Sequence, residues 1–204
     1  MIFGKKDRKQ ALLHLNKDPV MKKLIKEFEI DEWKKYGNSL FLDLIDAIIS
    51  QQLSGKASLS ISKRFKSLFT KNIKPADILL TPDEKLRACG LSSRKVSYIK
   101  GLAKSIEEKL IDIENMHKFS DKEVIEELIR IKGIGKWTAE MILLFSFQRP
   151  DIFSLGDLGL RTAVANLYKV DRSDIKKIEE ISLKWSPFRS TASRFLWKSL
   201  SKKN

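Results

Sequence analysis

The sequence predicts an all-α fold of roughly eight to ten helices. Apolar residues recur at steps of three and four along nearly the whole chain, which is the spacing of one helix face. No alternating pattern typical of a strand runs for more than about four residues. Side chains that cap helices stand before several of these apolar segments. With 42% hydrophobic residues, the chain has enough apolar material to bury a core.

The same periodicity locates the individual helices. Segment 40–50 is apolar on most sides, so we expect a central buried helix there. Thr81-Pro82-Asp83-Glu84 and Ser120-Asp121-Lys122-Glu123 have the pattern of a capping box, and in the first Pro82 takes the first helical position. Pro150-Asp151 is the expected seam between two lobes. The expected helices span about residues 19–29, 40–50, 57–68, 82–89, 94–110, 121–132, 136–145, 158–168, 174–185 and 190–201.

The charge balance indicates a polyanionic partner. Lys and Arg number 40 and Asp and Glu 26, which gives a formal net charge of +14. A chain this basic usually binds DNA, RNA or an anionic membrane face. Its single cysteine, Cys89, excludes an intrachain disulfide and an iron–sulfur or Cys-rich zinc site built from this chain alone. We expect neither a membrane span nor a signal peptide. The expected location is the cytoplasm, in association with the nucleoid, or the nucleus in a eukaryote.

The most informative stretch is a predicted helix-hairpin-helix at about residues 121–147. Gly133-Ile134-Gly135 makes a tight turn, because glycine accepts a positive φ, and a second helix follows at once. The turn leaves backbone N–H groups unpaired at a helix N-terminus, and together with Lys136 these groups suit a DNA phosphate. An ordinary αα-turn is the alternative, and the net charge of +14 favours DNA binding.

Asp157 follows a glycine and precedes a predicted helix. One interpretation is a plain N-cap, since Asp is among the residues preferred at that position. The other is a functional carboxylate placed next to the positive end of the helix dipole. The two interpretations are compatible with each other.

These residues resemble the helix-hairpin-helix (HhH-GPD) superfamily of base-excision DNA glycosylases. The hairpin 131–139 followed by Asp157 carries the likeness. Residues 50–57 (Ser-Gln-Gln-Leu-Ser-Gly-Lys-Ala) resemble the 3-methyladenine DNA glycosylase II branch, and so do residues 184–190 (Lys-Trp-Ser-Pro-Phe-Arg-Ser) with Trp197. The resemblance implies a middle lobe at 37–150, a second lobe formed by 1–36 and 151–204, and an active-site cleft between them. We expect the bacterial members' N-terminal β-rich domain to be absent.

The resemblance also implies roles for individual residues. Asp157 matches the catalytic aspartate, and Leu158 stands where some relatives carry an aromatic residue. A monovalent cation, Na⁺ or K⁺, is implied at backbone carbonyls near Ile131 and Gly133, and no other cofactor is expected. The remaining matched positions are Trp137, Met141, Trp197 and Leu158 for the substrate pocket, Gln52 and Leu53 for a wedge entering the duplex, and Gly133, Gly135, Lys136 and Thr138 for DNA contact.

The implied reaction is hydrolysis of the N-glycosidic bond of an alkylated purine, 3-methyladenine or 7-methylguanine, flipped out of double-stranded DNA. Bifunctional relatives carry a nucleophilic lysine where this chain has Trp137, so we expect a monofunctional enzyme without AP-lyase activity. Trp137, Trp197 and Leu53 are also open to interpretation as core residues. We expect a monomer. The alternatives are a non-catalytic helix-hairpin-helix DNA-binding protein and a glycosylase for mismatched or oxidised bases.

Overall fold

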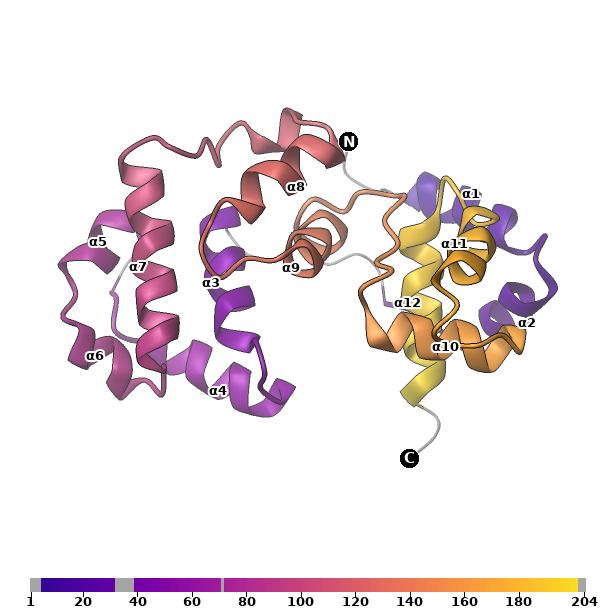
Figure 1. Ribbon diagram of the computed structural model, residues 1–204, viewed down its shortest axis with the longest axis horizontal. Coiled ribbons are helices and arrows are strands. Elements are labelled where there is room, and N and C mark those ends of the chain that lie inside the picture. Colours follow the sequence, from indigo (N-terminus) through magenta and orange to yellow (C-terminus); the bar gives the residue numbers. More distant parts are fainter. Residues whose placement is uncertain (1–4, 32–38, 71, 202–204) are drawn as a thin grey trace. The chain divides into compact units, whose positions relative to one another are not determined.

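The computed structural model describes residues 5–31, 39–70 and 72–201. Within these ranges the secondary structure is helical, with twelve α-helices, one 3₁₀ turn and one π-helical turn, and no strand forms (Figure 1). The all-α prediction is confirmed. Two helices were not predicted from the sequence, namely α1 (Lys5–Leu15), which begins with a run of polar residues, and α5 (Pro75–Leu80), which has only six residues. Neither segment contains enough regularly spaced apolar residues to be recognised as a helix from the sequence.

The chain divides into two compact units. Unit 2 comprises residues 36–142, and unit 1 comprises residues 1–35 with residues 143–204. The expected seam at Pro150-Asp151 therefore lies inside unit 1. Ser190 explains why, since its hydroxyl accepts the N–H of Ile152 at 2.9 Å and donates to the carbonyl of Arg149. The other expected boundary, at residues 36 and 37, lies outside the described residues.

Unit 2 is built around α3 (Leu40–Ser50), the expected central helix. Ser39 caps its start, and α3 packs against α4 and α7. Five of its apolar side chains are buried, namely Phe41, Leu44, Ile45, Ile48 and Ile49. The other helical elements of unit 2 are α4 (Gly55–Lys66), α5, α6 (Asp83–Ala88), α7 (Ser93–Glu107), the 3₁₀ turn η1 (Met116–Lys118), α8 (Asp121–Ile129) and α9 (Lys136–Met141).

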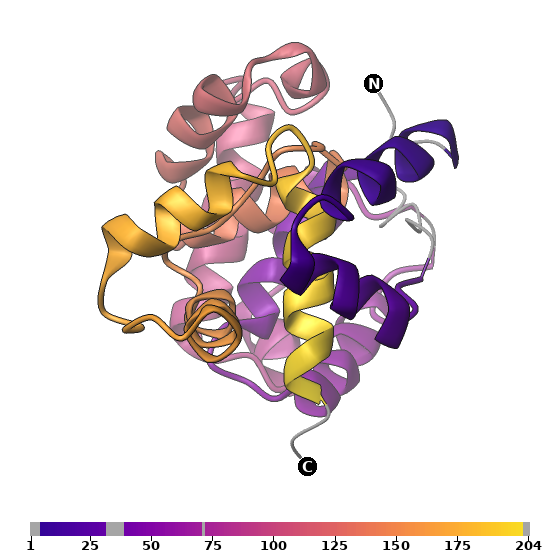
Figure 2. The same ribbon diagram turned by 90° about the vertical axis from the view of Figure 1, so that its right-hand side faces the viewer.

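Unit 1 is built around α12 (Arg189–Leu200), which lies between the N-terminal helices and α10 (Figure 2). The core there is aromatic: the fully buried ring of Trp185 packs against Phe153 and Tyr168. The remaining elements are α1, α2 (Pro19–Glu27), the π-helical turn η2 (Ile142–Ser146) at the unit boundary, α10 (Leu158–Tyr168) and α11 (Ile175–Leu183). None of the helices in the described part of the chain is long and apolar enough to cross a membrane.

Of the two expected capping boxes, one forms. Ser120 and Glu123 exchange hydrogen bonds at the start of α8, so this prediction is confirmed. The box at residues 81–84 was wrong. Pro82, without a side-chain donor or acceptor, occupies the N-cap of α6. The hydroxyl of Thr81, which follows α5, donates instead to the carbonyl of Asp77 within α5. Thr81 is therefore the C-cap of α5, a helix that the sequence analysis did not predict.

Asp151 supplies a pH-dependent part of the stability of unit 1. It accepts two hydrogen bonds from the Arg189 guanidinium, at 2.8 and 2.9 Å, and one from Ser186 at 2.8 Å. Burial alone raises the pKa of Asp151, but these hydrogen bonds and the charge of Arg189 outweigh it and hold the pKa below its ordinary value. The stabilisation is therefore present above the unfolded-state pKa of about 3.9 and is lost as pH falls through the lower folded-state pKa.

We expect Asp151→Asn to lower the free energy of unfolding at pH 7 by roughly 1–3 kcal/mol, because the Arg189 guanidinium loses its charged partner. The loss should shrink as the pH approaches about 3, where the carboxylate of the unvaried protein is itself protonated on unfolding. Urea denaturation at a series of pH values measures both effects. A deficit that stayed constant from neutral to acidic pH would contradict this assignment.

Candidate functional site

Asp157 occupies the N-cap of α10, as the capping interpretation predicts. Its Oδ1 accepts the backbone N–H of Leu160 at 2.7 Å and the indole N–H of Trp197 at 3.0 Å. The residue is 9% exposed, and its carboxylate lies at the positive end of the α10 dipole. Two N–H donors from different helices thus hold one carboxylate oxygen in place.

Trp197 reaches Asp157 from α12 with the edge of its indole. Its ring stacks on Phe145, with the centroids 5.8 Å apart and the planes inclined by 22°. Gly159 makes this approach feasible, since a Cβ there would lie 3.1 Å from Asp157 Oδ1 and 3.3 Å from the indole. The ring also lines an open hollow of about 250 Å³. The other lining residues of this hollow are Glu29, Ile30, Asp31, Phe145, Arg194, Lys198 and Ser201.

The hairpin lies in unit 2, between α8 and α9. Gly133 has a φ of +97°, and a Cβ there would lie 2.3 Å from the ring of Tyr98. Only glycine fits both conditions. Gly135 differs, because its φ of −96° is accessible to other residues and no atom lies within 4 Å of a Cβ built there. The expectation of positive φ thus holds for the first glycine alone. Ile134 is buried beneath the turn.

The four predicted α9 residues differ in exposure. Trp137 is 46% exposed, which sets aside its interpretation as a core residue. Met141 is half-buried, and Lys136 is exposed within 3.9 Å of Glu140. The side chain of Thr138 is buried at 5%, so only its backbone could meet DNA. A residue at the third position of α9 has a backbone N–H without an intrahelical acceptor.

The predicted wedge residues lie on a tight turn between α3 and α4. Gln52 is exposed and has a φ of +58°, and Leu53 is 39% exposed. Leu53 is therefore not a core residue at a helix end. The predicted site residues fall into two groups, one in each unit: Asp157, Leu158 and Trp197 in unit 1, and the wedge, hairpin and α9 residues in unit 2. Leu158 is 56% exposed beside Asp157.

The carbonyls suggested for a monovalent cation already accept hydrogen bonds. The oxygen of Ile131 accepts the N–H of Ile134 at 3.0 Å, and that of Gly133 accepts the Gln51 side-chain amide at 2.7 Å. A carbonyl oxygen has two lone pairs, so both remain compatible with a weakly held cation, which stays a prediction. Among the described residues, no cluster of three or more His, Cys, Asp or Glu could hold a metal.

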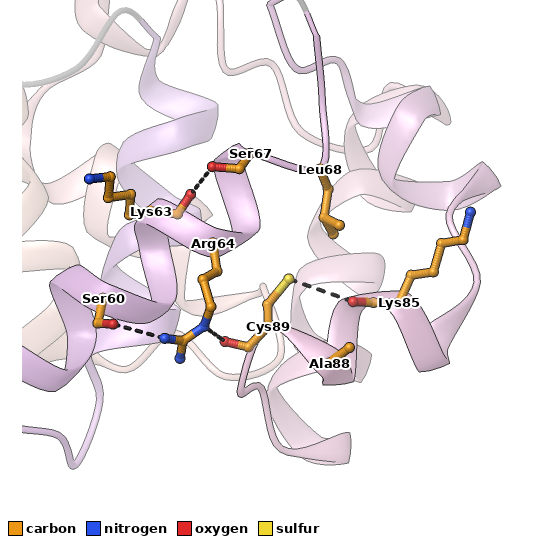
Figure 3. Close-up of a pocket in the computed structure, with 8 residues that line it drawn as sticks. All are labelled: Ser60, Lys63, Arg64, Ser67, Leu68, Lys85, Ala88 and Cys89. Carbon is orange, nitrogen blue, oxygen red and sulfur yellow. Dashed lines mark hydrogen bonds between the residues drawn. The ribbon is translucent and has the colours of Figure 1, made fainter.

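A separate hollow of about 430 Å³ lies between α4 and α6 and contains none of the predicted site residues (Figure 3). Arg64 crosses it, donating to the hydroxyl of Ser60 and to the carbonyl of Cys89. The Cys89 thiol is buried, and burial raises its pKa. The contacts of Arg64 hold α4 and α6 together, and the protonated thiol is a poor nucleophile. We therefore interpret the hollow as a packing feature between two helices and not as a reactive site.

Comparison with known proteins points to one family. The model of the HhH-GPD superfamily base excision DNA repair proteins matches residues 45–188. DNA-3-methyladenine glycosylase 1 of Schizosaccharomyces pombe is 39% identical over 163 residues, which cover 76% of this chain and 70% of that protein. The DNA-3-methyladenine glycosylase of Saccharomyces cerevisiae is 35% identical over 178 residues, 80% of this chain and 60% of that protein.

A solved structure shows the same fold. The 3-methyladenine DNA glycosylase of S. pombe, in complex with abasic DNA, superimposes with a TM-score of 0.85 and 34% sequence identity. The superposition covers 94% of this chain and 97% of that one. The agreement therefore extends over both units of the chain.

The two hairpin glycines provide a matched pair for testing the turn. We expect Gly133→Ala to lower the free energy of unfolding by roughly 2–4 kcal/mol, because alanine must adopt a positive φ and displace the Tyr98 ring. Gly135→Ala, at an uncrowded N-cap, should cost no more than about 1 kcal/mol. Chemical denaturation of both variants measures the difference. Equal losses would show that Tyr98 and the positive φ do not constrain the turn.

Proposed function

Because the chain belongs to the HhH-GPD superfamily of base excision DNA repair proteins, we propose that it is a monofunctional DNA glycosylase acting on alkylated purines. The bases released are 3-methyladenine and 7-methylguanine. The observation that carries this proposal is the carboxylate of Asp157, held at the N-terminus of α10 by Leu160 and Trp197. The names of the relatives from the two yeasts support the substrate class.

The proposed reaction begins with base flipping, which costs a few kcal/mol in lost stacking and pairing. The wedge residues Gln52 and Leu53, both exposed on their turn, replace the departed base. Alkylation at N3 or N7 makes the purine cationic, so the base can leave as a neutral molecule without a strong general acid. Exposed Trp137 offers an aromatic face to the electron-poor ring, an attraction worth about 0.5–2 kcal/mol.

Asp157 acts as the N-glycosidic bond breaks. The sugar becomes an oxocarbenium-like cation, and the carboxylate stabilises this charge and orients the water that adds to C1′. Trp197 has a second role beside the pocket position that the resemblance implies. Its indole N–H is bound to Asp157, so we assign it to fixing the carboxylate, while its ring forms a wall of the neighbouring hollow. Met141, one helical turn after Trp137, and Leu158, next to Asp157, are the apolar residues proposed for the substrate pocket.

The proposed partner is double-stranded DNA that contains alkylated bases. Gly133, Gly135, Lys136 and the backbone N–H of Thr138 contact a phosphate, a contact that does not depend on base sequence. A cation at the carbonyls of Ile131 and Gly133 would add positive charge beside that phosphate. The protein acts as a monomer where the DNA lies, in the nucleoid or nucleus.

Asp157→Asn tests the catalytic assignment. Asparagine keeps an oxygen that can accept the bonds from Leu160 and Trp197, so the fold should survive. Loss of the negative charge should slow base release by roughly 100- to 1000-fold. The measurement is incubation with methylated genomic DNA followed by chromatography of the free bases.

A second N-cap aspartate in unit 1 supplies the control for this experiment. Asp174 caps α11 through the N–H of Lys177 at 3.0 Å and is exposed, so Asp174→Asn repeats the chemical change away from the site. This control should release bases at the rate of the unvaried protein. Unchanged release by the Asp157 variant would overturn the catalytic role. If the unvaried protein showed salt-sensitive DNA binding without any release, it would be a non-catalytic DNA-binding protein.

The absence of lyase chemistry is tested by covalent trapping. A Schiff base between an enzyme amine and the abasic sugar is reduced by borohydride to a stable protein–DNA adduct. Position 137 holds tryptophan, and Lys136 projects about 100° away around the helix. We therefore expect no adduct on gel electrophoresis under conditions in which a bifunctional glycosylase forms one. An adduct at stoichiometric yield would refute the monofunctional assignment.

A further inference from the structure

We propose that Gln51 and Lys95 are positioning residues that lock the wedge turn to the hairpin turn, so that the two DNA-contacting turns of unit 2 act as one rigid body. This inference rests on the proposed function, because it assigns a task to the turn that carries Gln52 and Leu53. No sequence pattern indicates this contact, since Lys95 and Gln51 lie 44 residues apart.

The wedge turn needs support from outside itself. Residues 50–53 form a turn closed by the N–H of Leu53 and the carbonyl of Ser50 at 3.1 Å. Gln51 has φ −51° and ψ 128°, the first central position of a type II turn, and Gln52 follows with φ +58°. Glycine is preferred at that second position, and another residue there costs about 1 kcal/mol or more. Such a conformation persists only where its surroundings impose it.

Lys95 supplies the first constraint, from α7. Its ammonium donates to the carbonyls of Ile49, at 2.6 Å, and Gln51, at 2.9 Å. Carbonyls at the end of a helix lack intrahelical donors, and a positive charge is favourable there. Burial, and to a smaller extent the charge of Arg94, lowers the pKa of Lys95. The lowered pKa records the cost of holding this ammonium against the turn rather than in water.

Gln51 supplies the second constraint, between the two turns. Its side-chain amide donates to the carbonyl of Gly133 at 2.7 Å, across 82 residues of sequence. The ring of Tyr98, one helical turn after Lys95 on α7, packs against that same glycine. Neighbouring side chains of one helix therefore support both turns, Lys95 beneath the wedge and Tyr98 beneath the hairpin. The phosphate contact and the wedge are thereby held at a fixed spacing.

This coupling has a selective consequence. The wedge is needed to open a paired and stacked lesion, whereas a lesion without a pairing partner leaves the stack at lower cost. Loosening the wedge turn should thus slow release from paired DNA and spare release from unpaired DNA. A general loss of folding would slow both alike, so the ratio of the two rates separates positioning from stability.

The test uses Lys95→Met, which removes the ammonium and keeps an unbranched apolar side chain. It is compared on two duplexes that carry 7-methylguanine opposite either cytosine or a tetrahydrofuran abasic analogue. In single-turnover assays we expect release opposite cytosine to fall roughly 10- to 100-fold and release opposite the analogue to fall less than about 3-fold. A 2-aminopurine next to the lesion should show a correspondingly slower rise in fluorescence, because it reports unstacking directly.

Lys104→Met is the matched control. Lys104 lies on the same helix, is exposed and pairs only loosely with Glu108 at 3.7 Å, so the variant has the same net charge without touching the turn. It should match the unvaried protein on both duplexes. Gln51→Glu is the second variant: it keeps the side-chain volume but sets a carboxylate oxygen against the Gly133 carbonyl, and it should show the same selective loss.

The outcomes separate the two proposals. Equal losses on both duplexes, or no loss in either Lys95→Met or Gln51→Glu, would overturn the positioning role while the glycosylase assignment stands. If Lys95→Met is strongly destabilised in thermal unfolding, the isosteric Gln51→Glu decides the question alone. If the unvaried protein releases no base from either duplex, the proposed function itself fails.

Discussion

The hydrogen bond between the Trp197 indole and Asp157 is the interaction on which the candidate site depends. The N-cap bond from Leu160 is a single restraint on Oδ1, and a second donor from α12, 40 residues away, binds the same oxygen and restricts its movement further. The packing of α10 against α12 holds that donor in place, and the fully buried residues of these two helices belong to one core cluster, namely Leu160, Ala163, Val164, Ala192 and Leu196. The core of unit 1 therefore sets the position of this carboxylate.

In unit 2 the candidate site is formed largely by the backbone of two tight turns and not by a single side chain. Both of the turns proposed to contact DNA contain a residue at positive φ, Gln52 in one and Gly133 in the other. A turn of this kind is stable only when its neighbours hold it, and α7 contributes to both. Rigid turns suit a phosphate contact and a wedge, because ordering a loose loop on binding would reduce the affinity for DNA.

Sequence patterns predicted what local chemistry determines. The buried helix at 40–50, the cap at Ser120, the cap at Asp157 and the glycine at 133 all follow from residues within one or two helical turns of each other. The contacts that refine the site are between distant segments. Neither the Trp197 bond to Asp157 nor the Gln51 bond to Gly133 has a signal in the local sequence. The same holds for Tyr98, whose ring leaves no room for a side chain at position 133. Thr81 failed as a cap for the same reason, since a nearby helix competed for its hydroxyl.

Helix capping and a catalytic role are compatible explanations for Asp157. A comparison with Asp18, a second capping residue of unit 1, shows how the surroundings of the two carboxylates differ. Asp18 also caps a helix and also accepts an indole N–H, from Trp185 at 3.4 Å, together with the hydroxyl of Tyr168. Trp185 is fully buried, so the Asp18 network ties the two ends of the chain into one core. The partner of Asp157 instead lines an open hollow beside Phe145. The same hydrogen-bonding pattern ties Asp18 to a donor in the core, whereas the donor to Asp157 borders the surface, as the proposed catalytic role requires.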